Sequence, residues 1–347
     1  MNKLINTMHS SIAFTLAVIL LIAINSPNGF TQSKPLVVVQ DENGIHNSLS
    51  FSPDGERLLT TGSKTAIVWD AKTGEKLLTF EGHIPYGGAV ACGDFSPDGT
   101  KIATGGYSYT ALIWDSKTGK IEFKAKFIEG MLPNHIDSVA FSPNGENIAI
   151  GGGPVGLSIW DILSNNMIIQ FNMSYQANKM EYFPEGGKIL TQYLGNIKVI
   201  SVKGEILMQY SINGIAALSK DGKYIRNIVG DIDGILDKYE LRIIDVETNE
   251  RISSYTFNAK RGTPYLSTDG QFIVAASEKS PEGIGIRKVG ALDSVMRSFS
   301  LEANVDYNYM KVAFSDDNKK FACMIDTKAY IYDISDITSV IKESTAQ

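Results

Sequence analysis

Three aspartates within seven residues form the densest group of possible metal ligands in the sequence. They are Asp231, Asp233 and Asp237, and Gly234 lies between them. Carboxylates around a flexible glycine can wrap a hard cation such as Ca²⁺. The spacing does not match the EF-hand loop, in which the glycine is sixth and a glutamate twelfth. We therefore favour a solvated hairpin loop and expect no metal or other cofactor, with a calcium site as the alternative.

Catalytic motifs with recognisable spacing are missing from the sequence. The four histidines are scattered along the chain, at His9, His46, His83 and His135. The sequence holds no H-E-x-x-H or C-x-x-C zinc pattern, no P-loop and no G-x-S-x-G nucleophile turn. These absences lead us to predict that the protein is not an enzyme.

A sequence repeat predicts the secondary structure of the chain. Each of the three tryptophans precedes an aspartate and follows an F-S-P-[DN]-G box by 18 or 19 residues. The pairs are Trp69–Asp70, Trp114–Asp115 and Trp160–Asp161, and the boxes begin at Phe51, Phe95 and Phe141. Proline, aspartate and glycine in the box favour a tight turn between two strands. Each unit is therefore predicted to form four antiparallel strands joined by tight turns.

Weaker copies of the box continue to the end of the chain. They begin at Phe183, Leu218, Leu266 and Phe314, so the chain has seven boxes. Residues 32–347 then contain about 45 residues per unit, which is typical of propeller blades. The sequence predicts an all-β fold: one domain over 32–347, a seven-bladed β-propeller of four-stranded antiparallel blades. We expect the N-terminal strand 35–40 to complete the last blade outside 330–334, with 338–342 as the alternative.

The boxes, the I-W-D tripeptides and Glu81-Gly82-His83 together resemble the WD-repeat family of β-propellers. The resemblance implies that a histidine, a serine or threonine, an aspartate and a tryptophan hold each blade by hydrogen bonds. Only the second blade comes close to that set, with His83, Thr104 and Trp114, and the turn 105–109 lacks the aspartate. The blades are therefore expected to be held mainly by apolar packing.

The resemblance also implies a scaffold that binds a protein or peptide. The box turns and the K-T-G turns are expected at one rim of the ring, which we call the box rim. The other rim, the long-loop rim, would carry loops of individual length at 82–89, 129–135, 231–238 and 277–283. Loops on a rigid scaffold are where binding specificity usually resides. Partner binding is therefore assigned to Tyr86, Tyr107, Tyr109 and His135 on that rim, with random variation of loop length as the alternative.

A second kind of function would use the mouth of the central pore. A propeller that binds a small molecule, glycan or metal there, possibly with catalysis, needs carboxylates or histidines on several first strands. Asp94 and Asp137 are the candidates, but the other repeats supply no matching residues. We therefore keep this reading as the alternative to a protein-binding scaffold.

The N-terminal segment of the chain indicates where the protein acts. Residues 1–31 contain Lys3 as their one charged residue and an apolar run at 11–24, which predicts a signal peptide cleaved before Gln32. The run is shorter than the roughly 20 residues that span a bilayer, although an uncleaved membrane anchor is the alternative. The mature protein is therefore expected in the periplasm or outside the cell, without an integral membrane segment.

A net charge of −6 and the lack of a Lys/Arg cluster argue against nucleic acid as a partner.

Overall fold

The computed structural model describes sixteen stretches of the chain. They are residues 32–41, 45–83, 89–107, 110–125, 135–153, 156–171, 177, 179–193, 196–211, 214–230, 238–258, 264–267, 270–276, 283–289, 295–300 and 310–337. The predicted signal peptide, the acidic group at 231–237, Tyr86 and Tyr109 lie outside these stretches, as do most residues of the long loops. Within the described residues, no helix is both long and apolar enough to span a bilayer.

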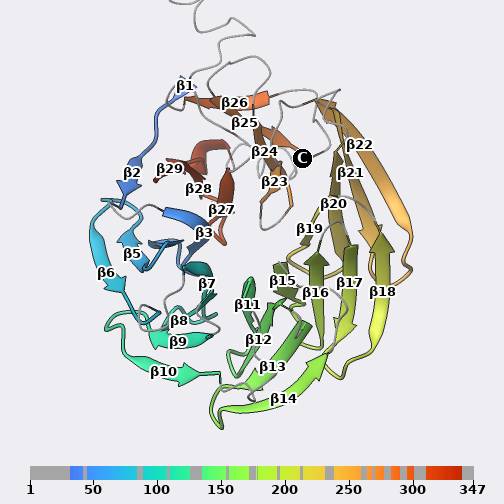
Figure 1. The fold of residues 1–347 in the computed structure, drawn as a ribbon. Coiled ribbons are helices and arrows are strands. Elements are labelled where there is room, and N and C mark those ends of the chain that lie inside the picture. The colour runs from blue at the N-terminus through green and yellow to red at the C-terminus, as the bar shows by residue number, and fades with distance from the viewer. Residues whose placement is uncertain are drawn as a thin grey trace, which may run out of the picture.

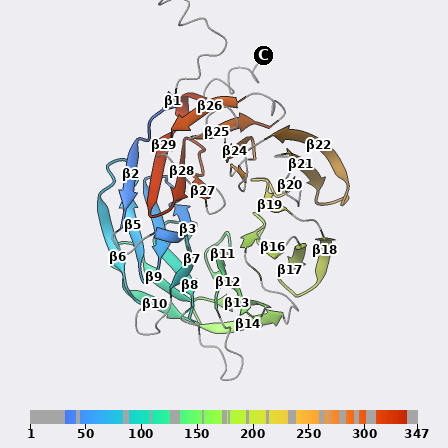
Figure 2. The ribbon, with the colours of Figure 1, turned by 45° about the horizontal axis from the view of Figure 1, so that its top comes forward.

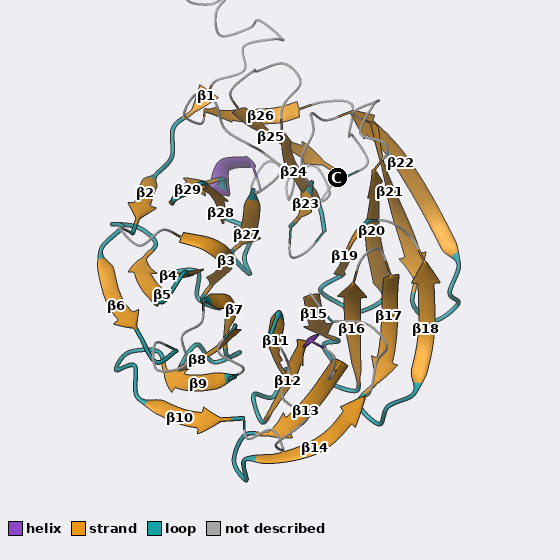
Figure 3. Ribbon diagram, in the orientation of Figure 1, coloured by secondary structure: helices purple, strands orange, loops and turns teal. Residues whose placement is uncertain are grey.

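Seven β-sheets are arranged in a ring, with one edge strand of each nearest the centre (Figure 1). In chain order the blades are β3(Ile45–Phe51), β4(Arg57–Gly62), β5(Ala66–Asp70) and β6(Lys76–Phe80); β7(Val90–Phe95), β8(Lys101–Gly106), β9(Leu112–Asp115) and β10(Ile121–Lys124); β11(Ser138–Phe141), β12(Asn147–Gly152), β13(Gly156–Asp161) and β14(Asn166–Phe171); β15(Lys179–Tyr182), β16(Lys188–Tyr193), β17(Asn196–Ser201) and β18(Ile206–Ser211); β19(Ile215–Leu218), β20(Tyr224–Gly230), β21(Lys238–Asp245) and β22(Arg251–Asn258); β23(Tyr265–Leu266), β24(Phe272–Ala276), β25(Gly283–Lys288) and β26(Val295–Ser300); and β27(Lys311–Phe314), β28(Lys320–Ile325) and β29(Lys328–Asp333). The predicted seven-bladed propeller is confirmed. Among the described residues, helical structure is confined to 335–337 and Gly153 (Figure 3).

The seventh blade is completed by a strand from the start of the chain. Strand β2(Val37–Gln40) pairs antiparallel with β29, and Val38 lies opposite Tyr330. The predicted closure by the N-terminal strand is therefore confirmed. A feature that the sequence did not predict is β1(Gln32–Ser33), which pairs parallel with β26 as a fifth strand of blade six (Figure 2). Residues 32–40 thus join blades six and seven.

The box turns are built by a local network that repeats around the ring. In blade one the Ser52 hydroxyl donates to Asp54 Oδ1 at 2.5 Å and accepts from the Arg57 amide at 2.9 Å. Gly55 has φ 69°, a left-handed conformation that glycine adopts without steric cost. Asn318 takes the same place in blade seven with φ 54°. The box therefore encodes one rigid turn rather than a flexible loop.

The fourth box is shifted by one residue from its predicted register. The Phe183 amide donates to the carbonyl of Lys188 at 2.9 Å, as the Ser52 amide does to Arg57 in blade one. Phe183 therefore occupies the serine position, and Tyr182 occupies the position assigned to phenylalanine. The prediction missed this because F-P-E-G is one residue shorter than the other boxes. Phe183 is fully buried, so its ring supplies apolar contact where the other boxes supply a hydroxyl.

Apolar residues of neighbouring blades pack against one another to form the core. Trp114 stacks on Phe80 of blade one with ring centroids 4.4 Å apart and an interplanar angle of 9°. Tyr332, which takes the place of tryptophan in blade seven, is buried against Phe299 and Phe321. The two cysteines, Cys92 and Cys323, are buried and free.

Candidate functional site

Buried hydroxyl groups accept hydrogen bonds from all three tryptophans. The Thr104 Oγ1 atom lies 2.9 Å from His83 Nε2 and accepts a hydrogen bond from Trp114 Nε1 at 3.1 Å. Burial lowers the pKa of His83 to about 4, so this histidine is neutral at pH 7. His83, Thr104 and Trp114 of blade two are thus joined in one buried hydrogen-bond network.

Blade one has a tryptophan bond that the sequence analysis missed. Trp69 Nε1 donates to Thr60 Oγ1 at 2.8 Å in a buried site, and Thr60 follows its box phenylalanine by the same interval as Thr104. In blade three Ile150 stands at that position, and Trp160 donates to Ser158 on its own strand at 3.0 Å. These hydrogen bonds add to the apolar packing that was expected to be the main interaction holding the blades.

The aspartate of each Trp-Asp pair organises the next turn. Asp70 Oδ1 accepts bonds from the Thr73 amide, the Thr73 hydroxyl and the Lys72 amide at 2.7–2.9 Å. Asp115 and Asp161 form similar bonds in their own turns. These bonds hold the pKa of the carboxyls below the usual value. The recurring Trp-Asp pair of this chain therefore serves the fold.

Two of the predicted partner-binding residues meet at the long-loop rim between blades two and three. The Tyr107 and His135 rings stack with centroids 5.6 Å apart and an interplanar angle of 22°. His135 Nε2 lies 3.1 Å from Asp137 Oδ2, and burial raises the pKa of that carboxyl while His135 opposes the rise. The Tyr107 amide donates to the Ala89 carbonyl, and the amide of Ile136, which follows His135, donates to the Gly106 carbonyl. These backbone bonds hold the two segments in place.

This arrangement presents a rigid aromatic surface to solvent. Tyr107 is 55% exposed, whereas His135 and Asp137 are partly buried beneath the rim. An exposed tyrosine backed by a second ring can pack against an apolar or aromatic group and still offer its hydroxyl for a hydrogen bond. Tyr107, His135 and Asp137 therefore form an exposed aromatic group backed by a histidine–carboxylate contact.

The carboxylates considered for a pore-mouth site have separate roles. Asp94 on β7 accepts a hydrogen bond from Ser50 of blade one at 2.6 Å. Burial raises the pKa of Asp94 to about 6, and this bond acts in the opposite direction. Asp137 instead pairs with His135 at the rim. Among the described residues, no three histidine, cysteine or acidic side chains are grouped as metal ligands would be.

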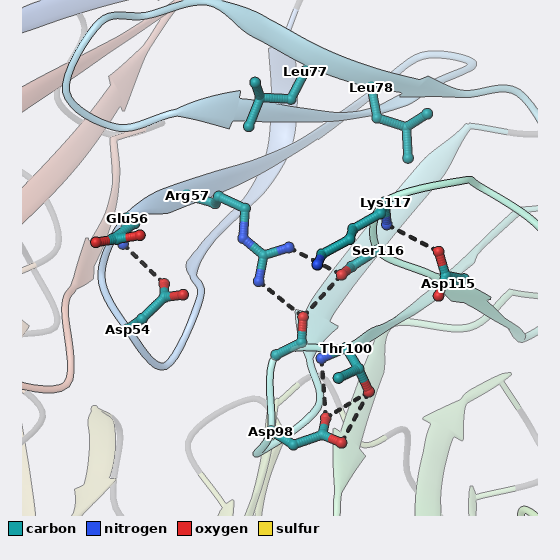
Figure 4. A pocket seen from close by; sticks show the side chains of 11 residues that line it. Asp54, Glu56, Arg57, Leu77, Leu78, Asp98, Thr100, Asp115, Ser116 and Lys117 are labelled. Atoms are coloured by element: carbon teal, nitrogen blue, oxygen red, sulfur yellow. Dashed lines mark hydrogen bonds between the residues drawn. The ribbon is translucent and has the colours of Figure 1, made fainter.

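A pocket of about 670 Å³ opens on the box rim at the seam between blades one and two (Figure 4). Arg57 spans the seam: its guanidinium donates to Ser116 Oγ at 2.9 Å and to the Gly99 carbonyl at 2.8 Å. It also lies over the Phe95 ring, 5.1 Å from the centroid. Leu77 and Leu78 of β6 form the apolar wall. Sequence reasoning did not find this pocket, because it is assembled from turns of two different repeats.

The sequence was compared with protein-family models and with curated proteins. The model of the WD domain, G-beta repeat, matches residues 34–70 and 74–115. The chain is a WD-repeat β-propeller. No curated protein matches it.

The matched segments show how the WD repeat is laid over the blades of this propeller. Residues 34–70 run from β2 to β5, and residues 74–115 run from β6 to β9. Each repeat therefore begins with the outer strand of one blade and continues with the three inner strands of the next. The first repeat begins with β2, which is the outer strand of the blade before it, and that blade is the seventh. Pairing of β2 with β29 therefore closes this WD-repeat propeller.

Proposed function

We propose that this WD-repeat propeller is a non-enzymatic scaffold that binds a protein or peptide outside the cytoplasm. Propellers of this family commonly serve as protein-interaction scaffolds. The leader-like composition of residues 1–31 supports export. The contact between Tyr107 and His135 is the observation that supports binding at the long-loop rim.

The site offers a partner both shape and polarity. Stacking on His135 restricts the Tyr107 ring before any partner arrives, which reduces the entropy lost on binding. Asp137 Oδ2 lies 3.1 Å from Nε2 at the edge of the histidine ring and restrains it there. Tyrosines in such settings are frequent anchors of protein interfaces.

The binding proposal is tested by capture from the native envelope and culture fluid, followed by mass spectrometry. We expect Tyr107→Ala to lose a specific protein that the wild type and Tyr255→Ala both retain. Tyr255 is the matched control, because it is also exposed but lies on the outer strand β22. Equal melting temperatures would show that all variants are folded. Retention of every captured protein by a folded Tyr107→Ala variant would contradict binding at this site.

Export is tested separately by mass spectrometry of the N-terminus. A signal peptide predicts a mature protein that begins at or near Gln32 in the periplasm or the culture fluid. Full-length protein in the membrane fraction would instead support the anchored alternative. Full-length protein confined to the cytoplasm would contradict export without affecting the binding proposal.

A further inference from the structure

The box-rim pocket between blades one and two has a chemistry that the proposed function does not use. Its volume of about 670 Å³ is that of a site for one or two side chains or a small ligand. We propose that this pocket binds a basic side chain, lysine or arginine, presented by an extended segment of a partner protein. The site is on the opposite rim from Tyr107 and would therefore be a second docking point on the same scaffold.

The charges around the pocket favour a cation. It is lined by four acidic residues, Asp54, Glu56, Asp98 and Asp115, and by two basic ones, Arg57 and Lys117. Hydrogen bonds within the turns hold the pKa of Asp98 and Asp115 below the usual value, and that of Asp54 is lowered as well. Among the residues that the structure describes, neither Asp54 nor Asp115 forms an ion pair. Both remain charged and able to receive a basic group.

The Arg57 guanidinium bonds to blade two and therefore serves the seam rather than a ligand. Its two bonds reach Ser116 and Gly99 of blade two, and its plane is held over Phe95. Lys320 makes the corresponding bond at the seam between blades seven and one, to the Gly55 carbonyl at 2.9 Å. Because a cation at this position joins neighbouring blades in both places, the structural role accounts for Arg57. The carboxylates are left as the polar groups available for binding.

The apolar wall suits the aliphatic part of a basic side chain. Leu77 is 47% exposed, and Leu78 beside it is partly buried. Lysine and arginine bury their methylene groups along apolar surface while their charged ends remain at polar groups. Figure 4 shows Leu77 and Leu78 on one side of Arg57 and Asp98 on the other. A bound side chain would therefore lie beside Arg57, with its methylene groups against the leucines and its charged end at a carboxylate.

The unpaired carboxylates distinguish this seam from the seam between blades seven and one. At the seam between blades seven and one, Lys319 stands where Glu56 stands in blade one, and it pairs with Asp317 at 3.0 Å. Asp317 corresponds to Asp54, so the carboxylate there is already neutralised by its neighbour. Both seams therefore have the hydrogen bond from a cation to the glycine carbonyl. Of these two seams, only the one between blades one and two leaves its aspartate without an ion pair in the described part of the chain.

The test uses short alanine-rich peptides with a fluorescent label and one central residue, which is arginine, lysine, norleucine or glutamate. We expect the purified chain to bind the arginine and lysine peptides weakly, with Kd on the order of 1 mM, and the ion pairs to account for about 1 kcal/mol of that affinity. The norleucine and glutamate peptides should bind at least about fivefold more weakly. Addition of 0.5 M NaCl should weaken the basic peptides, since exposed ion pairs are screened. Equal affinity for the glutamate and arginine peptides would overturn the proposal.

Variants locate the site and separate it from the long-loop rim. Glu56→Lys, which copies blade seven, should reduce affinity for the arginine peptide by about tenfold, and Lys117→Ala should increase it by about threefold. Asp317→Asn, at the other seam, and Tyr107→Ala should leave the affinity unchanged. Carbodiimide coupling of the lysine peptide should label Asp54 or Glu56 in the wild type. Undiminished binding by Glu56→Lys, or coupling that avoids both residues, would overturn the proposal even if Tyr107 proves to bind a partner.

Discussion

Lys320 in blade seven donates a hydrogen bond to the carbonyl oxygen of Gly55 in blade one at 2.9 Å, across 265 residues of sequence. Arg57 donates the equivalent bond to Gly99 at the next seam at 2.8 Å. Both cations begin the second strand of their blades, and both acceptors are the glycine of the following box. The seam that closes the ring therefore uses the same bond as an ordinary seam.

Loss of the closing bond is expected to weaken the whole ring. Lys320→Met keeps the aliphatic stem but removes the donor, and should lower the free energy of unfolding by about 1 kcal/mol. Urea unfolding measures this loss. Lys319→Met is the matched control, because that side chain is 60% exposed and its partner lies in the same turn. An equal loss in both variants would show that the Gly55 bond has no special role in closure.

The closing strand can be tested at two adjacent valines. Val39 is buried against the core of blades seven and one, whereas Val38 is 44% exposed on the same strand. Val39→Asp places a carboxylate in that core and should cost at least about 3 kcal/mol, while Val38→Asp should cost less than about 0.5 kcal/mol. Hydrogen exchange of the β29 amides reports release of the strand directly. Similar protection in the two variants would contradict a closing role for β2.

The buried threonines of blades one and two should differ in their importance. Thr104→Val removes an oxygen shared by His83 and Trp114, and is expected to cost about 2–4 kcal/mol. Thr60→Val removes one bond, that of Trp69, and should cost about 1–2 kcal/mol. Both changes conserve volume, so thermal or urea unfolding isolates the hydrogen bonds. A larger loss in Thr60→Val would contradict the network described for blade two.

Asp94 should make stability fall as the pH rises. Its pKa is raised from 3.8 to about 6 in the folded protein, so the folded state binds more protons than the unfolded state between these values. The resulting penalty grows from about pH 4 to about pH 6 and persists above it. Asp94→Asn removes the charge, so its stability relative to the wild type should increase by up to about 3 kcal/mol between pH 4 and pH 7.

The control for this pH effect is an aspartate whose pKa moves in the opposite direction. Hydrogen bonds from Ser96 and Thr100 lower the pKa of Asp98. Asp98→Asn should therefore lose stability relative to the wild type as the pH rises through the acidic range. Urea unfolding at several pH values measures both variants. The same pH trend in the two would contradict the burial argument for Asp94.

The features predicted well from sequence are those that a single repeat encodes. The box turn depends on bonds between Ser52, Asp54 and Arg57, all within six residues, so its residue types identify it wherever they recur. The blade-four box was placed one residue out of register, because its sequence lacks the serine and the burial of Phe183 decides the alignment. The Trp69–Thr60 bond was missed although Thr60 lies at the same interval as Thr104, a signal that was present in the sequence.

The sequence by itself therefore determined the number of blades, the turns and the closing strand, since period, turn chemistry and strand pattern are local properties that add up along the chain. The contact of Tyr107 with His135 and the pocket around Arg57 arose only on folding, because each joins residues of different blades. Their relative positions depend on how two sheets pack, and no spacing within one repeat contains that information. The same packing brings Ser50 of blade one within 2.6 Å of the Asp94 carboxyl, whose pKa is raised by burial.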